Sequence, residues 1–116
     1  MFDPPVPVVL GLWHAIRPDV DRIIVSGRDG AFAHRMRQSF TKHGVFPDAF
    51  FHRPKDDRRK DSIVKQQILD ELIRPRWDVL FAIDDRDQVV TMWRANGIPV
   101  LHVKDPGVER FICQQA

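Results

Sequence analysis

The stretch LFAIDDR, residues 80–86, joins a run of apolar residues to two adjacent carboxylates. A short apolar run of this kind is typical of a buried strand, and it ends abruptly at Asp84 and Asp85. Neighbouring carboxylates repel each other, so their adjacency is unfavourable unless a positive group lies close by. The stretch therefore predicts a strand whose end faces a cation or a cationic side chain.

Outward from this stretch, short apolar runs alternate with amphipathic segments along the chain. The expected strands are 22–26, 49–52, 79–83 and 100–103, and the expected helices are 6–16, 31–43, 61–73 and 87–96. On the helix 61–73 the apolar face is expected at Val64, Ile68 and Leu72, beside Leu69 and Ile73. Strands that alternate with helices predict an α/β fold with a mostly parallel sheet.

Composition narrows the class of protein. The 116 residues, 43% of them hydrophobic, fit one domain with a small core. A single Cys113 excludes an internal disulfide and a cysteine-based zinc site. The formal net charge of +2 permits an anionic partner without requiring one. Since no apolar run approaches the roughly 18 residues of a membrane span and no secretory signal begins the chain, we expect a cytoplasmic protein without membrane contact.

Polar residues follow two of the expected strands. Ser26, Gly27 and Arg28 come after 22–26, whereas Asp84 and Asp85 come after 79–83. In open parallel sheets, ligands bind at the carboxyl ends of the strands, so these residues are expected at one site. Carboxylate oxygens suit Mg²⁺ and the arginine fork suits phosphate. The pattern therefore predicts a site for a divalent cation and a phosphate.

The same residues also fit ordinary structural roles. Asp84 and Asp85 could form a turn, with Asp87 capping the next helix. Residues 53–60, RPKDDRRK, fit a solvated loop and a track for a nucleic-acid backbone equally well, because five of the eight are cationic. The five histidines show no metal-site spacing, and the three tryptophans fit core packing better than base stacking.

Four segments form a joint pattern: VSGR at 25–28, RKDSIVK at 59–65, AIDDR at 82–86 and QVVTMWRANGIPVLHV at 88–103. Together they resemble the haloacid dehalogenase-like (HAD) superfamily. Within it, the pattern is most similar to the 3′-phosphatase domain of phage polynucleotide kinase-phosphatases. The resemblance spans roughly residues 3–103 and implies a Rossmann-like fold of three layers.

The resemblance also implies a role for each polar residue. The implied phosphate-binding residues are Ser26, Gly27 and Arg28, the implied magnesium ligands are Asp84 and Asp85, and the implied catalytic residues are Asp61 and Lys65. Lys65 would neutralise the charge that develops on the transferred phosphoryl group, and Asp61 would orient the lysine or the arginine. Lys60 lies in the same motif and stays an alternative to Lys65.

The chain departs from this family near its start. The family's nucleophile motif, two aspartates separated by one residue and followed by glycine and threonine, does not occur in the sequence. Asp3, which precedes two prolines, has no strand before it, so we interpret it as lying after the position of that motif. The first, central strand is then expected to be missing. The phosphatase-type domain is expected over residues 1–104, with 105–116 as a C-terminal tail.

Two functions fit this pattern. One is a phosphatase for nucleic-acid or nucleotide phosphates whose nucleophile comes from another segment or chain. The other is a non-catalytic module that binds phosphate or nucleic acid. A receiver domain fits less well, because it has no place for the Ser-Gly-Arg turn.

The expected partners are a phosphate-bearing nucleotide or nucleic-acid end, and a chain or second copy that supplies the missing strand. Without that strand, a gap between 22–26 and 79–83 is not expected to stay open, so either the two strands pair directly or a partner strand fills the space.

Overall fold

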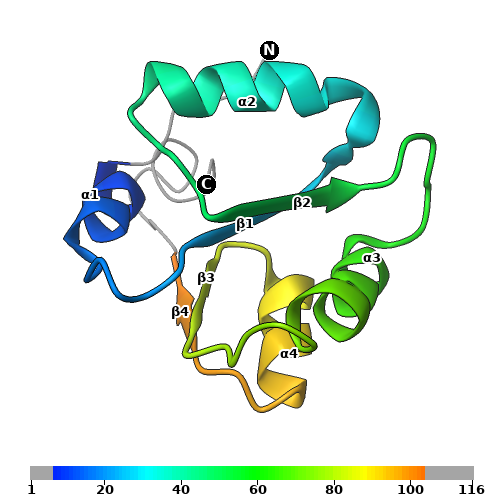
Figure 1. Cartoon of the computed structure of the whole chain (residues 1–116). Helices are drawn as coiled ribbons and strands as arrows, with labels where there is room; N and C mark the ends of the chain where they lie inside the picture. Colours follow the sequence, from blue (N-terminus) through cyan, green and yellow to red (C-terminus); the bar gives the residue numbers. More distant parts are fainter. Residues whose placement is uncertain (1–6, 104–116) are drawn as a thin grey trace.

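The computed structural model describes residues 7–103, in which helices and strands alternate as expected (Figure 1). The elements are α1 (Pro7–Ala15), β1 (Ile23–Asp29), the 3₁₀ turn η1 (Gly30–Phe32), α2 (Ala33–Lys42), β2 (Ala49–Arg53), α3 (Asp61–Ile68), the π-helical turn η2 (Leu69–Ile73), β3 (Ala82–Asp84), α4 (Asp87–Ala95) and β4 (Val100–His102). The predictions for Asp3, Cys113 and the tail 105–116 lie outside the described residues. No helix between residues 7 and 103 has the length and apolar character needed to cross a bilayer.

The four strands form two separate parallel sheets rather than one. β1 pairs with β2, with Ile23 opposite Ala49, and β3 pairs with β4, with Ala82 opposite Val100. Direct pairing of β1 with β3, one of the two expected outcomes, does not occur in the described chain. Each sheet is held by its own helix, since α3 packs on β1 and β2 while α4 packs on β3 and β4. Because α3 also packs against α4, these helices set the separation of the two sheets.

The two sheets share one hydrophobic core. Its buried residues come mainly from α3, η2 and α4: Val64, Ile68, Leu69, Ile73, Val89, Met92, Trp93 and Ile98. Ile23 and Val25 of β1 pack against this cluster, and so does Ala82 of β3. The domain is therefore one packing unit although its sheet is divided.

Helices cover both faces of the first sheet. On β2, Phe51 packs toward the core, with its ring centroid 6.2 Å from that of Trp77. The next side chain back, Phe50, points the other way and meets Phe40 of α2, with a centroid distance of 5.1 Å. Adjacent strand residues face opposite sides of a sheet. The layers are therefore α2, the sheet, and α3 with α4, as Figure 1 shows.

The end of the third expected helix departs from α-helical geometry. Residues 69–73 form a π-helical turn, in which the N–H of Arg74 donates to the carbonyl of Leu69 over 2.9 Å. The extra residue in the turn rotates the apolar face. Leu69 and Ile73 are buried, whereas Leu72 is 44% exposed. The prediction that Leu72 lies on the buried face is therefore wrong.

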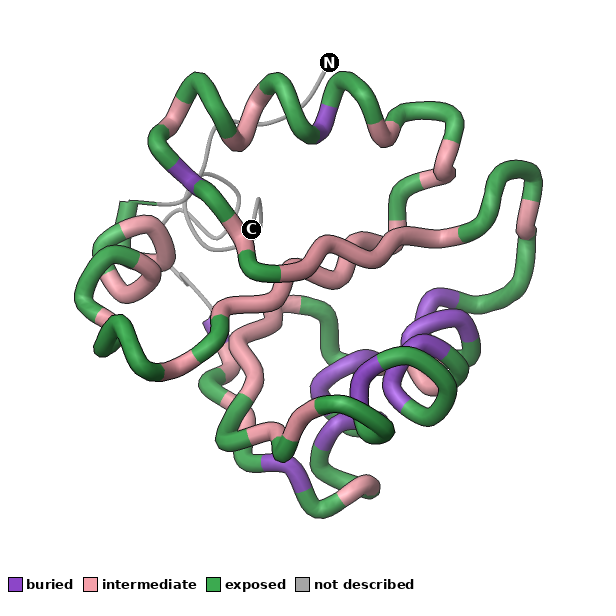
Figure 2. The backbone as a smooth tube through the Cα atoms, in the orientation of Figure 1, coloured by how far each residue is buried: buried purple, intermediate pink, exposed green. Residues whose placement is uncertain are grey.

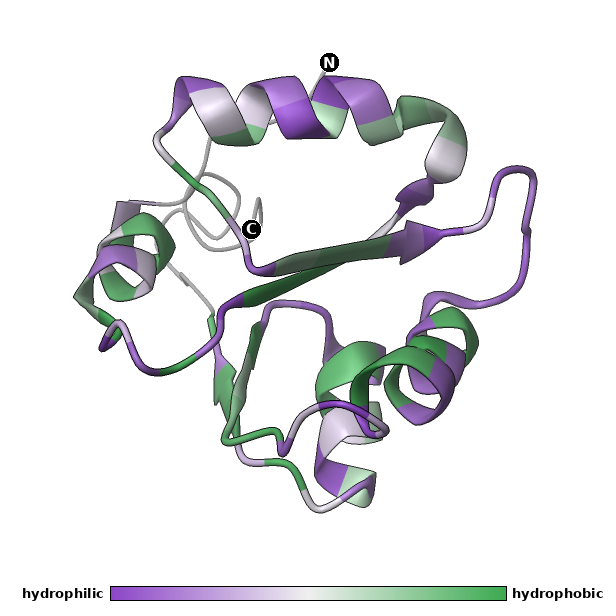
Figure 3. Cartoon of the chain, viewed as in Figure 1, coloured by the Kyte–Doolittle hydropathy of each residue, from purple (hydrophilic) through white to green (hydrophobic). Residues whose placement is uncertain are grey.

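Burial is uneven across the fold (Figure 2). The buried residues gather on α3, η2 and α4, whereas no residue of α1, β1 or β3 is buried. The strands β1 and β3 nevertheless consist largely of hydrophobic residues (Figure 3). The third strand is also shorter than predicted, since it begins at Ala82, and the preceding Leu80 and Phe81 are 62% and 44% exposed. The apolar strands next to the division of the sheet are incompletely covered.

Candidate functional site

Lys65 lies at the centre of a buried group of charged side chains. Its side chain is only 9% exposed, and its Nζ lies 3.4 Å from Asp84 Oδ2 and 3.7 Å from Asp61 Oδ2. Both distances are long for a charge-assisted hydrogen bond, which is usually 2.7–2.9 Å. Lys60, the alternative lysine, is exposed at the start of α3. The structure thus brings Lys65, Asp61 and Asp84 together and leaves Lys60 outside.

Asp61 begins α3 and is surrounded by three cations. Its Oδ2 lies 3.3 Å from Arg86 Nη1, and its Oδ1 lies 3.5 Å from Arg53 Nη2, in addition to the contact with Lys65. Oδ1 is buried and makes no hydrogen bond with the described residues, because the contact with Arg53 is too long for one. A carboxylate that is 5% exposed needs such cations to offset its loss of hydration. Asp61 is therefore placed to orient cations rather than to contact solvent.

The turn at the end of β1 requires glycine. A Cβ atom on Gly27 would lie 2.1 Å from Asp61 Oδ1, which is far inside van der Waals contact. The carbonyl of Gly27 accepts a hydrogen bond of 2.7 Å from Arg53 Nε. Beside it, Ser26 Oγ accepts a hydrogen bond of 3.1 Å from the N–H of Arg28. The segment 26–28 is therefore held tightly against Asp61, at the carboxyl end of the strand.

Arg53 connects this turn to the basic loop. Besides Gly27 and Asp61, its guanidinium donates to the carbonyls of Asp57 and Arg59. Neither Arg53 nor Arg86 is predicted as a site residue from the sequence, although each lies near a strand end. That position, next to the carboxyl end of a parallel strand, is the signal that identifies them.

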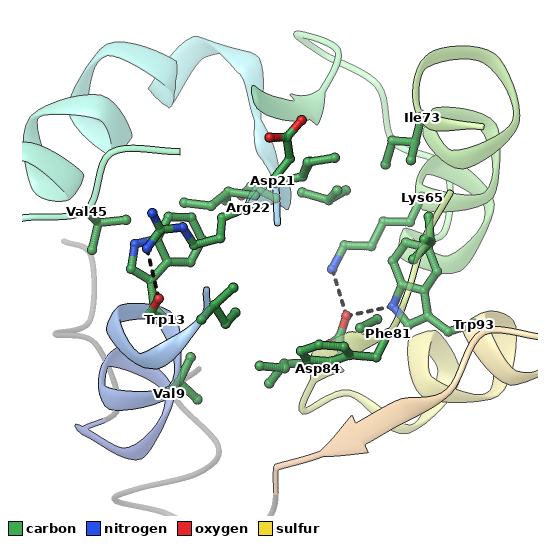
Figure 4. Close-up of a pocket in the computed structure, with 18 of the residues that line it drawn as sticks. Val9, Trp13, Asp21, Arg22, Val45, Lys65, Ile73, Phe81, Asp84 and Trp93 are labelled. Carbon is green, nitrogen blue, oxygen red and sulfur yellow. Dashed lines mark hydrogen bonds and ion pairs between the residues drawn. The ribbon is translucent and has the colours of Figure 1, made fainter. Parts of the chain in front are cut away.

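Asp84 and Asp85 differ in their surroundings. Asp84 Oδ1 accepts the N–H groups of Asp85 at 2.8 Å and Arg86 at 3.3 Å. Its Oδ2 accepts Nε1 of Trp93 at 3.2 Å as well as Lys65 Nζ (Figure 4). Burial, and next the charge of Asp84, raise the pKa of Asp85 from 3.8 to about 6. Both carboxylate oxygens of Asp84 thus accept hydrogen bonds, whereas the surroundings of Asp85 disfavour its ionised form.

Trp93 therefore has a second role that the sequence does not show. It is 5% exposed and belongs to the core, as predicted. Its indole N–H also fixes one oxygen of Asp84. The sequence marks only its helical spacing, so this polar contact becomes visible only in the structure.

The described residues hold no group of three histidine, cysteine, aspartate or glutamate side chains that could bind a metal ion. Asp84 and Asp85 supply at most two carboxylates. Such a pair fits a Mg²⁺ ion only if the ion keeps several waters or gains another oxygen ligand from elsewhere.

A cavity of about 960 Å³ lies next to these side chains. Residues of β1 line it, as do residues 79–81 and β3 across the division of the sheet. Trp13 of α1 and Phe40 of α2 add apolar surface. Lys65 and Asp84 extend into the cavity (Figure 4). The cavity therefore has apolar walls and a charged end.

Comparison with solved structures identifies relatives of this chain. The chain superimposes with a TM-score of 0.74, at 32% identity over 83% of its length, on one chain of the solved Pnkp1/Rnl/Hen1 complex. A second structure, of the Pnkp1/Rnl/Hen1 RNA repair complex, gives the same score and identity. The chain spans 33% and 30% of those two solved chains. These matches confirm the predicted HAD-like α/β fold.

A sequence relative and a family model agree with the structural matches. Over 51 residues the chain is 39% identical to a protein of Autographa californica nuclear polyhedrosis virus assigned as a bifunctional polynucleotide kinase/RNA ligase. That stretch is 44% of this chain and 7% of the viral protein. The model of the polynucleotide kinase PNKP phosphatase domain matches residues 2–107. The chain therefore belongs to the HAD-like family of PNKP phosphatase domains.

Proposed function

We propose that this chain forms part of a phosphatase for phosphates at nucleic-acid or nucleotide ends, of the polynucleotide 3′-phosphatase type. The nucleophilic aspartate would come from another segment or chain. The observation that carries the proposal is the buried ammonium of Lys65, which extends into a cavity and makes only long contacts with Asp61 and Asp84. An additional anion at hydrogen-bond distance would complete its coordination.

The neighbouring residues suit a phosphate in that position. Ser26 contributes a hydroxyl and Arg28 a guanidinium, and both residues line the cavity. Phosphoryl transfer gains chiefly from positioning and from cations placed on the developing negative charge. In the proposed site, Lys65 and Arg28 would supply that charge, and Asp61 would hold Lys65 in place.

The described carboxylates at this site are poorly suited to act as the nucleophile. Both oxygens of Asp84 already accept hydrogen bonds, and Asp61 is buried among cations. Asp85 has a raised pKa, so part of it is protonated near neutral pH. Covalent catalysis requires an accessible, ionised carboxylate. This argument supports a nucleophile from outside residues 7–103.

Mg²⁺ is the cofactor that the proposal expects, with Asp84 and Asp85 as the residues that would hold it. When bound, the ion would add positive charge next to the transferred phosphoryl group. A cation would also favour the ionised form of Asp85, because it offsets the charge of Asp84.

A non-catalytic role in binding phosphate or nucleic acid is the second candidate. The basic loop supports it, because Lys55, Arg58, Arg59 and Lys60 are exposed on the segment that Arg53 ties to the site. Cations of this kind contact nucleic-acid backbones without reading sequence. Both solved relatives are chains of a Pnkp1/Rnl/Hen1 complex, which one of the two structures describes as an RNA repair complex, and this supports an RNA end and protein partners for this chain as well.

The test measures release of 3′-phosphate from a short oligonucleotide in the presence of Mg²⁺. The chain is assayed alone, with an added peptide carrying the nucleophile motif, and fused to that segment. We expect turnover only when the motif is supplied, and loss of turnover in Asp84→Asn. Turnover by the chain alone that survives Asp84→Asn would contradict the proposal.

Binding without turnover in every arm would favour the non-catalytic role. Binding is followed by amide shifts on titration with inorganic phosphate. Arg28→Ala should weaken it more than Arg17→Ala, which removes an exposed arginine paired only with Asp19 in the described contacts. Equal effects of the two changes would indicate general charge attraction.

A further inference from the structure

The exposed face of α2 carries positive charge and no negative charge. Its exposed side chains form two adjacent rows at helical spacing: His34, Arg37 and Thr41, and Arg35, Gln38 and Lys42. Residues 30–47 contain no aspartate or glutamate, although the chain has 16 of them. The cations Arg35, Arg37 and Lys42 give this segment a formal charge of +3, against +2 for the whole chain. The helix, largely hydrophilic in Figure 3, thus presents a cationic surface to solvent.

The layer on the other side of the sheet carries charges of both signs. There the exposed Asp70 pairs with Arg74 over 2.9 Å, so the two charges offset each other. On α2, no carboxylate within residues 7–103 pairs with Arg37 or Lys42. The guanidinium of Arg37 instead lies 5.0 Å from the ring centroid of Phe50. Like charges on one helix face repel each other, and a bound polyanion would remove that repulsion.

The basic loop adjoins the start of this helix. One carboxylate joins the two, because Asp29 Oδ2 accepts the N–H of Asp56 at 2.7 Å and Oδ1 accepts the N–H of Ala31 at 2.8 Å. These hydrogen bonds, and after them the nearby charges of Lys55 and Arg58, lower the pKa of Asp29. Asp56 has a φ of 63°, a left-handed backbone conformation that is uncommon for residues other than glycine. The loop is therefore held in a specific place beside α2.

The loop and the helix together form one cationic surface, which we call the basic strip: Lys55 and Arg58 of the loop, and Arg37 and Lys42 of α2. Because β1 and β2 are parallel, α2 returns from the carboxyl end of β1 to the amino end of β2 (Figure 1). Its 10 residues span about 15 Å. The strip therefore leads away from the candidate site along the outside of the sheet.

We propose that the basic strip binds the body of a single-stranded polynucleotide whose 3′ end occupies the candidate site. The position of that end rests on the proposed function. The strand would leave the site past Lys55 and Arg58 and continue along α2 toward Lys42. Contacts of lysine and arginine with phosphates do not read sequence, so the strip would favour longer strands rather than particular bases.

Exposed aromatic rings flank the helix and favour a single strand over other polyanions. Phe32, directly before α2, is 44% exposed, and Phe46, shortly after its end, is 68% exposed. Phe46 is the most exposed large hydrophobic side chain among residues 7–103. The bases of a single strand stack on such rings, whereas a peptide of acidic residues has no bases to stack. The cations thus fit the phosphates of one strand, and the rings fit its bases.

The test is binding of a fluorescently labelled uridine dodecamer with a 3′-hydroxyl, measured by anisotropy on the full chain without Mg²⁺. Four phosphate contacts on a single strand predict that log affinity falls with log salt at a slope of about −3. A uridine dinucleotide should bind about tenfold more weakly, because it cannot extend from the site to the end of α2. Amide shifts caused by the dodecamer should include residues 34–42 and 55–60.

Two double variants locate the binding surface. Arg37→Gln with Lys42→Gln should weaken dodecamer binding by about tenfold and reduce the salt slope by about half. Arg76→Gln with Arg94→Gln is the matched control and should bind as the unchanged chain does. Arg76 also lies over an aromatic ring, that of Trp77, and Arg94, like Lys42, lies in the last turn of its helix. Urea midpoints compare the folding of the two variants, and Lys42→Gln alone decides if they differ.

Three results would overturn the inference: no dodecamer binding at about 50 mM salt, equal effects of the two double variants, or equal binding of polyglutamate, which would indicate an acidic protein as the partner. Titration with inorganic phosphate tests the proposed function separately. Phosphate shifts at Ser26 and Gly27 without dodecamer binding would refute the strip alone. Dodecamer binding without phosphate shifts or 3′-phosphate release would refute the proposed function and leave the strip as a polynucleotide surface.

Discussion

Gly27→Ala tests the packing between the end of β1 and Asp61. The added Cβ atom would lie 2.1 Å from Asp61 Oδ1 and 2.8 Å from its Cγ. Ordinary contact begins near 3.4 Å, so the two groups must separate by more than an ångström. Asp61 is held by Arg53, Arg86 and Lys65 and cannot move alone. Overpacking of a rigid site costs about 1–3 kcal/mol, which we expect as the loss in the free energy of unfolding.

Urea denaturation provides the measurement, with Gly11→Ala as the matched control. Gly11 lies within α1, and a Cβ atom there meets nothing within 4 Å. The same substitution should therefore stabilise the chain by about 0.5–1 kcal/mol, because alanine favours the helix. Gly27→Ala should also weaken phosphate binding, whereas Gly11→Ala should not. Equal stability of Gly27→Ala and the unchanged chain would refute the described contact with Asp61.

Four further substitutions test the charged site and the tryptophan that contacts it. Asp85→Asn should raise the free energy of unfolding by about 1–2 kcal/mol at about pH 7 and leave it unchanged at about pH 3. The reason is that the pKa of Asp85 is raised to about 6 in the folded chain, so the folded state loses stability as pH rises through that value and Asp85 ionises. Asp84→Asn should instead destabilise the chain by about 1–3 kcal/mol, so urea curves showing the same sign for both would contradict their described surroundings. Lys65→Met should cost about 3 kcal/mol in urea unfolding, since it leaves buried carboxylates short of a cation; a neutral effect would argue against a buried charge pair. Trp93→Phe should lower the midpoint of thermal unfolding more than Trp77→Phe. The indole N–H of Trp93 donates to a buried carboxylate, whereas that of Trp77 donates to an exposed one. The reverse order of the two midpoints would exclude a role for Trp93 in holding Asp84.

The sequence predicts the elements of the fold well and their pairing less well. Each expected helix and strand is present, with shifted ends, because hydrophobic periodicity and terminal glycines act locally. The π-helical turn at 69–73 is not predicted, since it depends on packing that a periodic pattern does not contain. Among residues 7–103 the sheet is divided with no strand between β1 and β3, an outcome that the sequence does not predict.

The residues of the candidate site can also be predicted from the sequence only in part. The strand-end rule places Ser26 and Asp84 together, and the resemblance adds Lys65; all three line one cavity, but the rule treats Asp84 and Asp85 as equivalent. Their difference arises from Trp93 and from burial, which adjacent positions in the sequence do not distinguish. Arg53 is likewise indistinguishable from the other cations of its loop until its contacts with Gly27 and Asp61 are seen.

The division of the sheet also has a consequence for how the chain folds. Among residues 7–103 the paired strands are neighbours in the sequence: β1 pairs with β2 across η1 and α2, and β3 pairs with β4 across α4. Each half of the fold, β1 with β2 or β3 with β4, can therefore form its hydrogen-bonded ladder from segments that are close in sequence. This keeps the entropic cost of loop closure low. Cooperativity between the halves depends on α3, whose contacts with α4 and the first sheet join them. We therefore expect the two halves to behave as two local folding units, with α3 determining whether they unfold together or one after the other.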